Sequence, residues 1–151
     1  MKTMRWICDE EGQDMVELAL VAPLLILLFM GVYVIGYYAY YAIEVRNAAH
    51  AGAIYAMQSS TTATDTGNIT LYSQRDVPEK NITVTPSNYY VCLGALNGTH
   101  YTAATDAAAS CTSYQMMVRV QTSLALDTPL AVPGLPASIT LSGNSVMEVQ
   151  N

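Results

Sequence analysis

The chain has 151 residues and a mass of 16.3 kDa, which is enough for one modest domain and an additional element. Charged residues make up 12% of it and apolar residues 52%, whereas soluble domains carry about 25% charge, so a plain cytosolic globular protein is excluded. The formal charge is −6, from 12 acidic and 6 basic residues. Nucleic-acid binding needs a basic face, so we expect no nucleic-acid partner.

The junction between a short polar opening and a long apolar run is the first informative feature. The polar opening ends at Gly12, and Gln-Asp-Met-Val-Glu follows it. Glu17 lies at the edge of the apolar run, where a lone carboxylate is costly: about 2.5–3.5 kcal/mol at mid-membrane and less near the edge. Two interpretations stay open. Glu17 rests among lipid headgroups, or it favours the helix N-terminus through the helix dipole.

Residues 18–43 contain no charged side chain. As a helix these 26 residues would be about 39 Å long, which exceeds the roughly 30 Å hydrocarbon layer of a bilayer. The apolar core of a cleavable secretory signal has only about 7–15 residues. We therefore expect a single transmembrane helix. Lys2 and Arg5 precede it and Arg46 alone follows closely, which predicts a cytoplasmic N-terminus and an extracytoplasmic remainder.

Tyrosines gather at the C-terminal end of this run. Tyr33, Tyr37 and Tyr41 are spaced four residues apart and so share one helix face. They fit an interfacial aromatic belt, and they also fit a stripe that packs against identical neighbouring helices; both can hold at once.

The helix is expected to continue beyond the span, from residue 13 to about residue 58, because the next residues are rich in Ala and free of Pro. Ala48 and Gly52 are four residues apart, a spacing that lets two helix backbones approach closely. The alternative is that this alanine-rich helix lies on the chain's own head.

The head, residues 59–151, is expected to begin with a polar loop over residues 59–68. Residues 118–126 then alternate between apolar and polar side chains, which predicts a half-buried strand. Residues 139–149 predict a second strand or a hairpin that turns at Gly143 and Asn144, residues 82–84 and 89–93 predict two short strands, and residues 129–136 predict a loop. A small antiparallel sheet packed on the outer half of the helix gives an α+β fold.

Cys92 and Cys111 fall in the outer part of the chain, and Cys8 falls before the span. In an oxidising compartment Cys92 and Cys111 would form a disulfide that closes about 20 residues and adds roughly 3 kcal/mol of stability. Two unpaired thiols are the alternative. Neither cysteine has the CxxC spacing, and with His100 they are too few for a zinc site, so we expect no metal and no cofactor.

The sequence contains no catalytic motif of the common kinds: no nucleophile elbow, no Walker motif, no HExxH and no dinucleotide-binding turn. A membrane-tethered enzyme would need such a constellation. We therefore expect an assembly component and not an enzyme.

The polar leader ending in Gly12, the Glu at the fifth position after it and the apolar run together resemble a type IV prepilin. The resemblance implies that a prepilin peptidase cuts between Gly12 and Gln13 on the cytoplasmic side, which makes residues 1–12 a leader. It also implies that Glu17 pairs with the N-terminal ammonium of an adjacent subunit and sets the register of assembly. One departure is that the residues just before Gly12 are acidic, whereas leaders of this family are usually basic.

The run from Gly12 to Ala56 is similar to the opening of TadE-like proteins, the minor pilins of tight-adherence (Flp) pilus systems, and residues 133–150 resemble their closing strands. This resemblance implies a minor pilin or pseudopilin that works in adhesion and surface attachment. Its partners would be the peptidase, other pilin subunits, the assembly machinery and the lipid bilayer. It would reside in the inner membrane and, after processing, in an extracellular pilus. The alternative is an uncleaved single-pass membrane protein with an extracytoplasmic binding domain.

Overall fold

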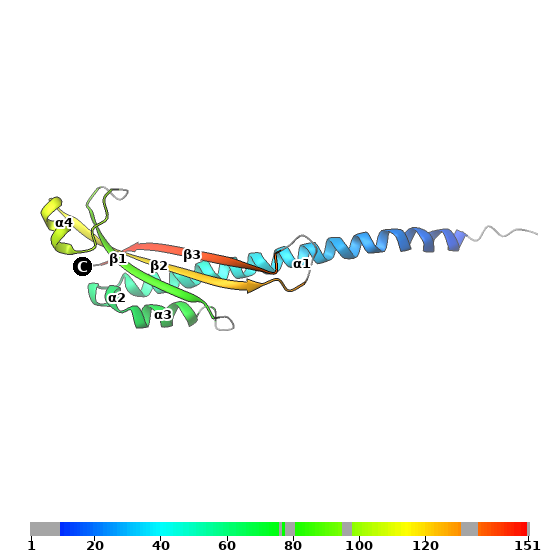
Figure 1. The fold of residues 1–151 in the computed structure, drawn as a ribbon, viewed down its shortest axis with the longest axis horizontal. Coiled ribbons are helices and arrows are strands. Elements are labelled where there is room, and N and C mark those ends of the chain that lie inside the picture. The colour runs from blue at the N-terminus through cyan, green and yellow to red at the C-terminus, as the bar shows by residue number, and fades with distance from the viewer. Residues whose placement is uncertain (1–9, 76, 78–80, 95–97, 131–135, 151) are drawn as a thin grey trace, which may run out of the picture. The chain divides into compact units, whose positions relative to one another are not determined.

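The computed structural model describes residues 10–75, 77, 81–94, 98–130 and 136–150, without the side chains of residues 10–13. Residues 1–9 of the predicted leader therefore lie outside the described part. The chain forms two compact units, one up to Tyr37 and one from Tyr38 onward. The elements are α1 (Glu10–Ala56), α2 (Ser60–Thr64), α3 (Thr66–Arg75), β1 (Thr83–Cys92), α4 (Ala104–Ser110), β2 (Tyr114–Asp127) and β3 (Ser138–Glu148) (Figure 1).

Helix α1 has 47 residues, which corresponds to a length of about 70 Å. It continues through Pro23, whose missing N–H removes one of its backbone hydrogen bonds. The helix ends at Ala56, two residues before the predicted end at residue 58. Directly after it, Ser59 caps α2: its Oγ accepts from the Thr62 N–H at 3.2 Å, and its own N–H donates to Thr62 Oγ1 at 2.9 Å.

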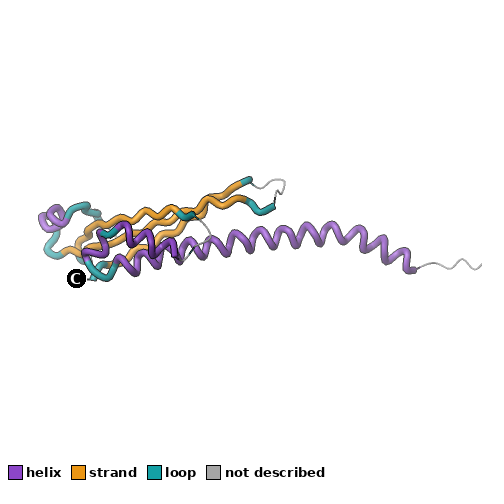
Figure 2. The backbone as a smooth tube through the Cα atoms, turned by 90° about the horizontal axis from the view of Figure 1, so that it is seen from below, coloured by secondary structure: helices purple, strands orange, loops and turns teal. Residues whose placement is uncertain are grey.

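The second unit contains a three-stranded antiparallel sheet in the order β1-β2-β3, so the predicted α+β class is confirmed. In this unit the strands run alongside the C-terminal part of α1 (Figures 1 and 2). The predicted alternation holds in β2, where the even-numbered residues are the buried ones; they are Met116, Val118, Val120, Thr122, Leu124 and Leu126.

The prediction of a loop over residues 59–68 is wrong, because α2 and the beginning of α3 occupy this segment. Serine and threonine here act as helix caps, and Asp65 begins α3 by accepting the Asn68 N–H at 3.0 Å. Only Ala63, Ile69 and Ser73 are buried along the two helices, so their apolar pattern is too sparse to reveal a helix in the sequence.

Of the two alternatives for residues 139–149, the strand is observed as β3, and the hairpin that turns at Gly143 and Asn144 is wrong, because β3 passes through both residues. The two short strands predicted for residues 82–84 and 89–93 are one strand, β1, which includes Pro86. Proline is tolerated there because β1 lies at the edge of the sheet. In the predicted loop, residues 129, 130 and 136 are outside helices and strands, and residues 131–135 are outside the described part.

The core of the second unit lies between α1 and the sheet, with α2 and α3 contributing to it. One face of α1 is fully buried at spacings of three and four residues, which is the period of a helix packed on a layer. Most of these side chains are small, which lets the helix backbone lie close to the strands. The buried residues of this face are Val45, Ala48, Ala49, Gly52, Ala53 and Ala56.

Candidate assembly and membrane site

The N-terminal motif lies at the beginning of α1. Gly12 and Gln13, the predicted cleavage pair, are in its first turn, where the first four N–H groups have no partner within the helix. Glu17 follows on the same helix, is exposed, and makes no ion pair with any residue that the structure describes. Gln13 and Glu17 are four residues apart and thus on one face of the helix.

The stretch of α1 that follows is apolar and, apart from the buried Val34, largely exposed. Leu20, Leu24 and Ile35 leave 76%, 69% and 70% of their surfaces exposed. A continuous exposed apolar surface of this length has to be covered by lipid or by other protein, because its contact with water is unfavourable. By length and composition, α1 is the one helix among the described residues that could cross a membrane.

The three tyrosines of the predicted stripe have different environments. Tyr33 and Tyr37 stack on each other, with ring centroids 6.4 Å apart and an interplanar angle of 28°. Tyr33 is more than half exposed. Tyr41 belongs to the second unit, where it is only 9% exposed and meets the Tyr40 ring edge-on at 5.2 Å.

Ala48 and Gly52 pack within the second unit. Ala48 is fully buried, and a Cβ atom at Gly52 would collide with Ser73 Oγ and approach Ile69 of α3. Gly52 thus allows the close approach that the sequence predicts, and its neighbour is α3 of the same chain. The structure therefore has the second of the two predicted arrangements, the alanine-rich helix lying on its own head.

A hydrogen bond joins α1 to the head at Tyr38. The Tyr38 hydroxyl donates to Thr128 Oγ1 at 2.7 Å, and the Thr128 hydroxyl donates in turn to the Pro136 carbonyl. Residues 38–43, which the sequence analysis assigned to the membrane span, thus belong to the same compact unit as the head.

A second contact between α1 and the sheet gives two strand residues a role that the sequence did not predict. Thr122 of β2 is buried, and its hydroxyl donates to the Val45 carbonyl at 2.7 Å. Gly143 lies opposite Thr122 in β3, and a Cβ atom there would meet the Val45 carbonyl oxygen at 2.5 Å. Glycine allows this approach of strand to helix. The sequence did offer one signal: Gly143 occupies a position where the alternating pattern of the strand calls for an apolar side chain.

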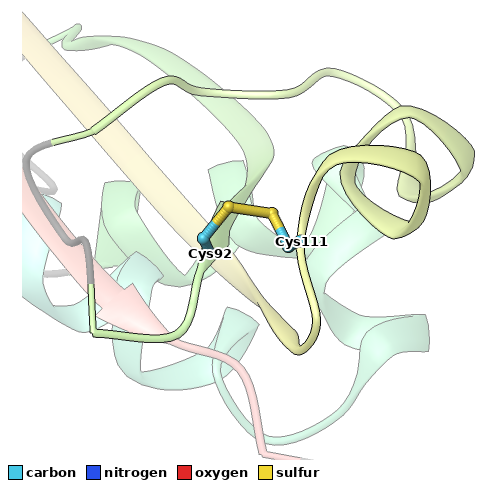
Figure 3. The surroundings of a disulfide bond; sticks show 2 residues. All are labelled: Cys92 and Cys111. Carbon is cyan, nitrogen blue, oxygen red and sulfur yellow. A yellow bond between two sulfur atoms is a disulfide. The ribbon is translucent and has the colours of Figure 1, made fainter.

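Cys92 and Cys111 are joined in a disulfide with an S–S distance of 1.98 Å and a Cα–Cα distance of 5.4 Å. Cys92 is the last residue of β1 and Cys111 directly follows α4 (Figure 3). The bond therefore ties α4 and its flanking loops to the edge strand.

Tyr55, Asp65 and Asn68 form the most perturbed titratable cluster of the described residues. The backbone N–H and the side-chain amide of Asn68 both donate to Asp65, which lowers the pKa of this carboxyl. Partial burial and the neighbouring Asp65 carboxylate raise the pKa of Tyr55. Tyr55 also stacks on Tyr72 with ring centroids 4.5 Å apart, so the cluster joins α1 to α3.

The two histidines take no part in a group that resembles a catalytic or metal site. His100 is exposed and stacks on Tyr89 with ring centroids 4.4 Å apart, and the Arg119 guanidinium lies 5.1 Å from the Tyr89 ring. His50 is exposed on α1. Among the described residues no three His, Cys, Asp or Glu side chains are grouped so that they could hold a metal ion.

Comparison with known proteins finds a family model that matches part of this chain. Residues 12–53 match the family model of TadE-like proteins, a segment that starts at the predicted cleavage pair and ends on the buried face of α1. No curated protein and no solved structure matches the chain. The long N-terminal helix of this chain is therefore similar to that of TadE-like proteins, as its sequence predicts.

Proposed function

We propose that this protein is a minor pilin or pseudopilin of a tight-adherence pilus system, made as a membrane-anchored precursor and processed by a prepilin peptidase. The observation that carries the proposal is the coincidence of the TadE-like match with the Gly12–Glu17 junction and the exposed apolar helix. The uncleaved membrane-anchored binding protein is the alternative, and its anchor would need neither Gly12 nor Glu17.

In the proposed reaction, the peptidase hydrolyses the bond between Gly12 and Gln13 and leaves a new ammonium group on Gln13. The Glu17 carboxylate, which makes no ion pair with any described residue, would then pair with the ammonium of an adjacent subunit. A pair of opposite charges inside a membrane costs far less than two isolated ones. Only one axial stagger of two helices brings the two groups together, so the pair would set the register.

We further propose that the membrane span ends at Tyr37 and not at Ile43. The twenty residues from Leu18 to Tyr37 would be about 30 Å long as a helix, which equals the thickness of the hydrocarbon layer. The bond from Tyr38 to Thr128 supports this boundary, because it brings a polar loop of the head to the helix directly after that stretch. The head would then lie at the extracytoplasmic membrane surface.

Two measurements test processing and assembly separately. Intact mass of the membrane-extracted protein, with and without the peptidase, should give a chain starting at Gln13 only when the peptidase is present. A full-length chain in both samples would favour the uncleaved anchor. Glu17→Ala should leave cleavage intact and abolish incorporation into filaments, whereas Asp14→Ala, an acidic neighbour outside the apolar run, is the matched control. Normal assembly of the Glu17 variant would contradict the register role.

The span boundary is tested with single cysteines in nanodiscs, on a Cys8→Ser background with the disulfide intact. A water-soluble maleimide should label Ile43→Cys and leave Ile35→Cys unlabelled. Both side chains are exposed in the folded chain, so protection of either one reports lipid. Equal protection of the two positions would extend the span to the boundary at residue 43 and contradict the shorter one.

A further inference from the structure

The two edges of the sheet differ in how far they are closed to an additional strand. On β1, Pro86 has no N–H to donate, and Tyr90 and Tyr101 exchange backbone hydrogen bonds of 2.7 and 2.9 Å. On β3, the eleven residues contain no Pro, Lys or Arg, and among the described residues the strand pairs only with β2. Sheets normally protect such an edge, because its free N–H and C=O groups accept another strand.

A groove with a positive charge runs beside the middle of this open edge. Its walls are the exposed face of α1, with Arg46, Asn47 and His50, and residues 142–145 of β3. The Arg46 side chain is exposed and makes no ion pair with any described residue. The contacts of Val45 with Thr122 and Gly143 hold β3 against the helix, so the open edge and the cation stay side by side.

A second copy of this chain fits the open edge poorly through antiparallel pairing or through its β1. Gly143 lies against Val45 and the Gln150 N–H donates to the Met57 carbonyl at 2.8 Å, so β3 and this part of α1 run in the same direction. Antiparallel pairing of two β3 strands would reverse the helix of one copy, which two chains anchored in one membrane with the same orientation do not allow. Pairing of β3 with β1 of another copy meets Pro86 and the Tyr101 bridge.

We propose that the outer edge of β3 binds an extended segment of a different protein by strand addition, with a carboxylate side chain of that segment beside Arg46. Main-chain hydrogen bonds to β3 provide the affinity in this mode of recognition, and side chains provide the specificity. The lone cation selects an acidic partner over a basic one. The exclusion of a second copy rests on the proposed membrane anchoring, whereas the open edge and its cation do not depend on peptidase cleavage.

The test attaches the probe strand to the full chain in detergent micelles. A flexible Gly-Ser linker of about twelve residues, with a root-mean-square span of about 20 Å, follows residue 151 and carries an eight-residue Thr/Val strand with one central Glu. The tether holds the strand at a millimolar effective concentration, so that weak pairing is still detected. Control strands carry Lys in place of Glu, or Pro at alternate positions. The readouts are amide hydrogen exchange of residues 142–145 and the thermal midpoint.

The expected result is slower exchange of residues 142–145 and a higher midpoint with the Glu strand than with the Pro strand. The Lys strand should protect these amides roughly two- to fivefold less than the Glu strand, the range for an exposed charge pair. Arg46→Glu, a change at an exposed side chain, should reverse that order, and Asn47→Asp is the control for added negative charge. Equal exchange with the Glu and Pro strands would overturn strand addition at this edge.

Two further outcomes would also overturn parts of the proposal. An order of Glu and Lys strands that does not respond to Arg46→Glu would remove the acidic partner. Concentration-dependent dimerisation of the unmodified chain, with protection of residues 142–145 in the dimer, would make a second copy the occupant. Cleavage at Gly12 is measured separately by mass, so failure here and failure of the pilin proposal are distinguishable.

Discussion

Replacing Gly143 with Ala tests whether close approach of β3 to α1 explains the glycine. The added Cβ would lie 2.5 Å from the Val45 carbonyl oxygen and 2.6 Å from Thr122 Oγ1. Because one of these atoms belongs to the helix backbone, the strand or the helix has to move. The same movement would weaken the buried hydrogen bond from Thr122 to Val45.

Two terms give the size of the effect. Overpacking of a close-packed core by one methyl group costs about 1–3 kcal/mol. Loss of a buried hydrogen bond adds about 1 kcal/mol, and about 1–3 kcal/mol where a polar group stays unsatisfied. The sum is roughly 2–6 kcal/mol, and at about 4 °C per kcal/mol for a domain of this size the midpoint should fall by roughly 8–24 °C.

The assay is thermal unfolding of the full chain in detergent micelles, with the disulfide intact, followed by near-ultraviolet circular dichroism. Gly67→Ala is the matched control, because its added Cβ meets only Asp65 Oδ1 at 3.7 Å, an ordinary contact. Thr122→Val replaces the hydroxyl with a methyl group of similar volume, so it removes the hydrogen bond, and it should cost about 1 kcal/mol. A midpoint for Gly143→Ala no lower than that of Thr122→Val would refute the close-approach explanation.

Three further predictions concern the head. Reduction of the Cys92–Cys111 bond, which closes a sequence separation of 19, should lower the free energy of unfolding by about 3 kcal/mol; equal urea midpoints before and after reduction would contradict this. The pKa of Asp65 is lowered in the folded state, so its contribution to stability is complete above its ordinary value of 3.8 and is lost as the pH falls through the folded value. Asp65→Asn keeps a capping oxygen and should therefore flatten the stability profile below pH 4, as measured by urea unfolding at several pH values. Gly52→Ala should lower the free energy of unfolding by about 1–3 kcal/mol, because its Cβ meets Ser73 Oγ. Adding Ser73→Ala, which removes a buried hydroxyl that has no hydrogen-bond partner among the described residues, should restore part of that stability. Strict additivity in this double-mutant cycle would show that the two sites are not in contact.

The sequence by itself determined the features that depend on long, one-sided patterns. Twenty-six uncharged residues from Leu18 to Ile43 leave a membrane-spanning helix as the economical structure in so small a chain. The strict alternation around Val118 and Val120 leaves a half-buried strand. The Gly12–Glu17 junction led to the TadE-like family, because an acidic residue at the edge of an apolar run is costly and therefore uncommon.

Only the tertiary structure decided the features for which several local conformations are nearly equal in energy. Gly143 and Asn144 suit a turn as well as a strand, and the approach of β3 to the Val45 carbonyl is what keeps them in the strand. The Ser- and Thr-rich segment after α1 suits a loop as well as capped helices, and burial of Ile69 against the core selects the helices.

The tertiary structure also decided which part of α1 packs in the head and which part leaves its apolar surface exposed. Small residues such as Ala48 and Gly52 promote close packing with any helix, so their spacing says nothing about which neighbour they meet. The fold brings α3 of the same chain to Gly52 and buries one face of the helix from Tyr41 onward. Most large apolar side chains before Tyr38 keep their surface exposed, and Val34, which is buried, departs from this. Local pattern thus specifies that this helix must bury its surface, and only the packed head determines how much of that surface is left for the membrane.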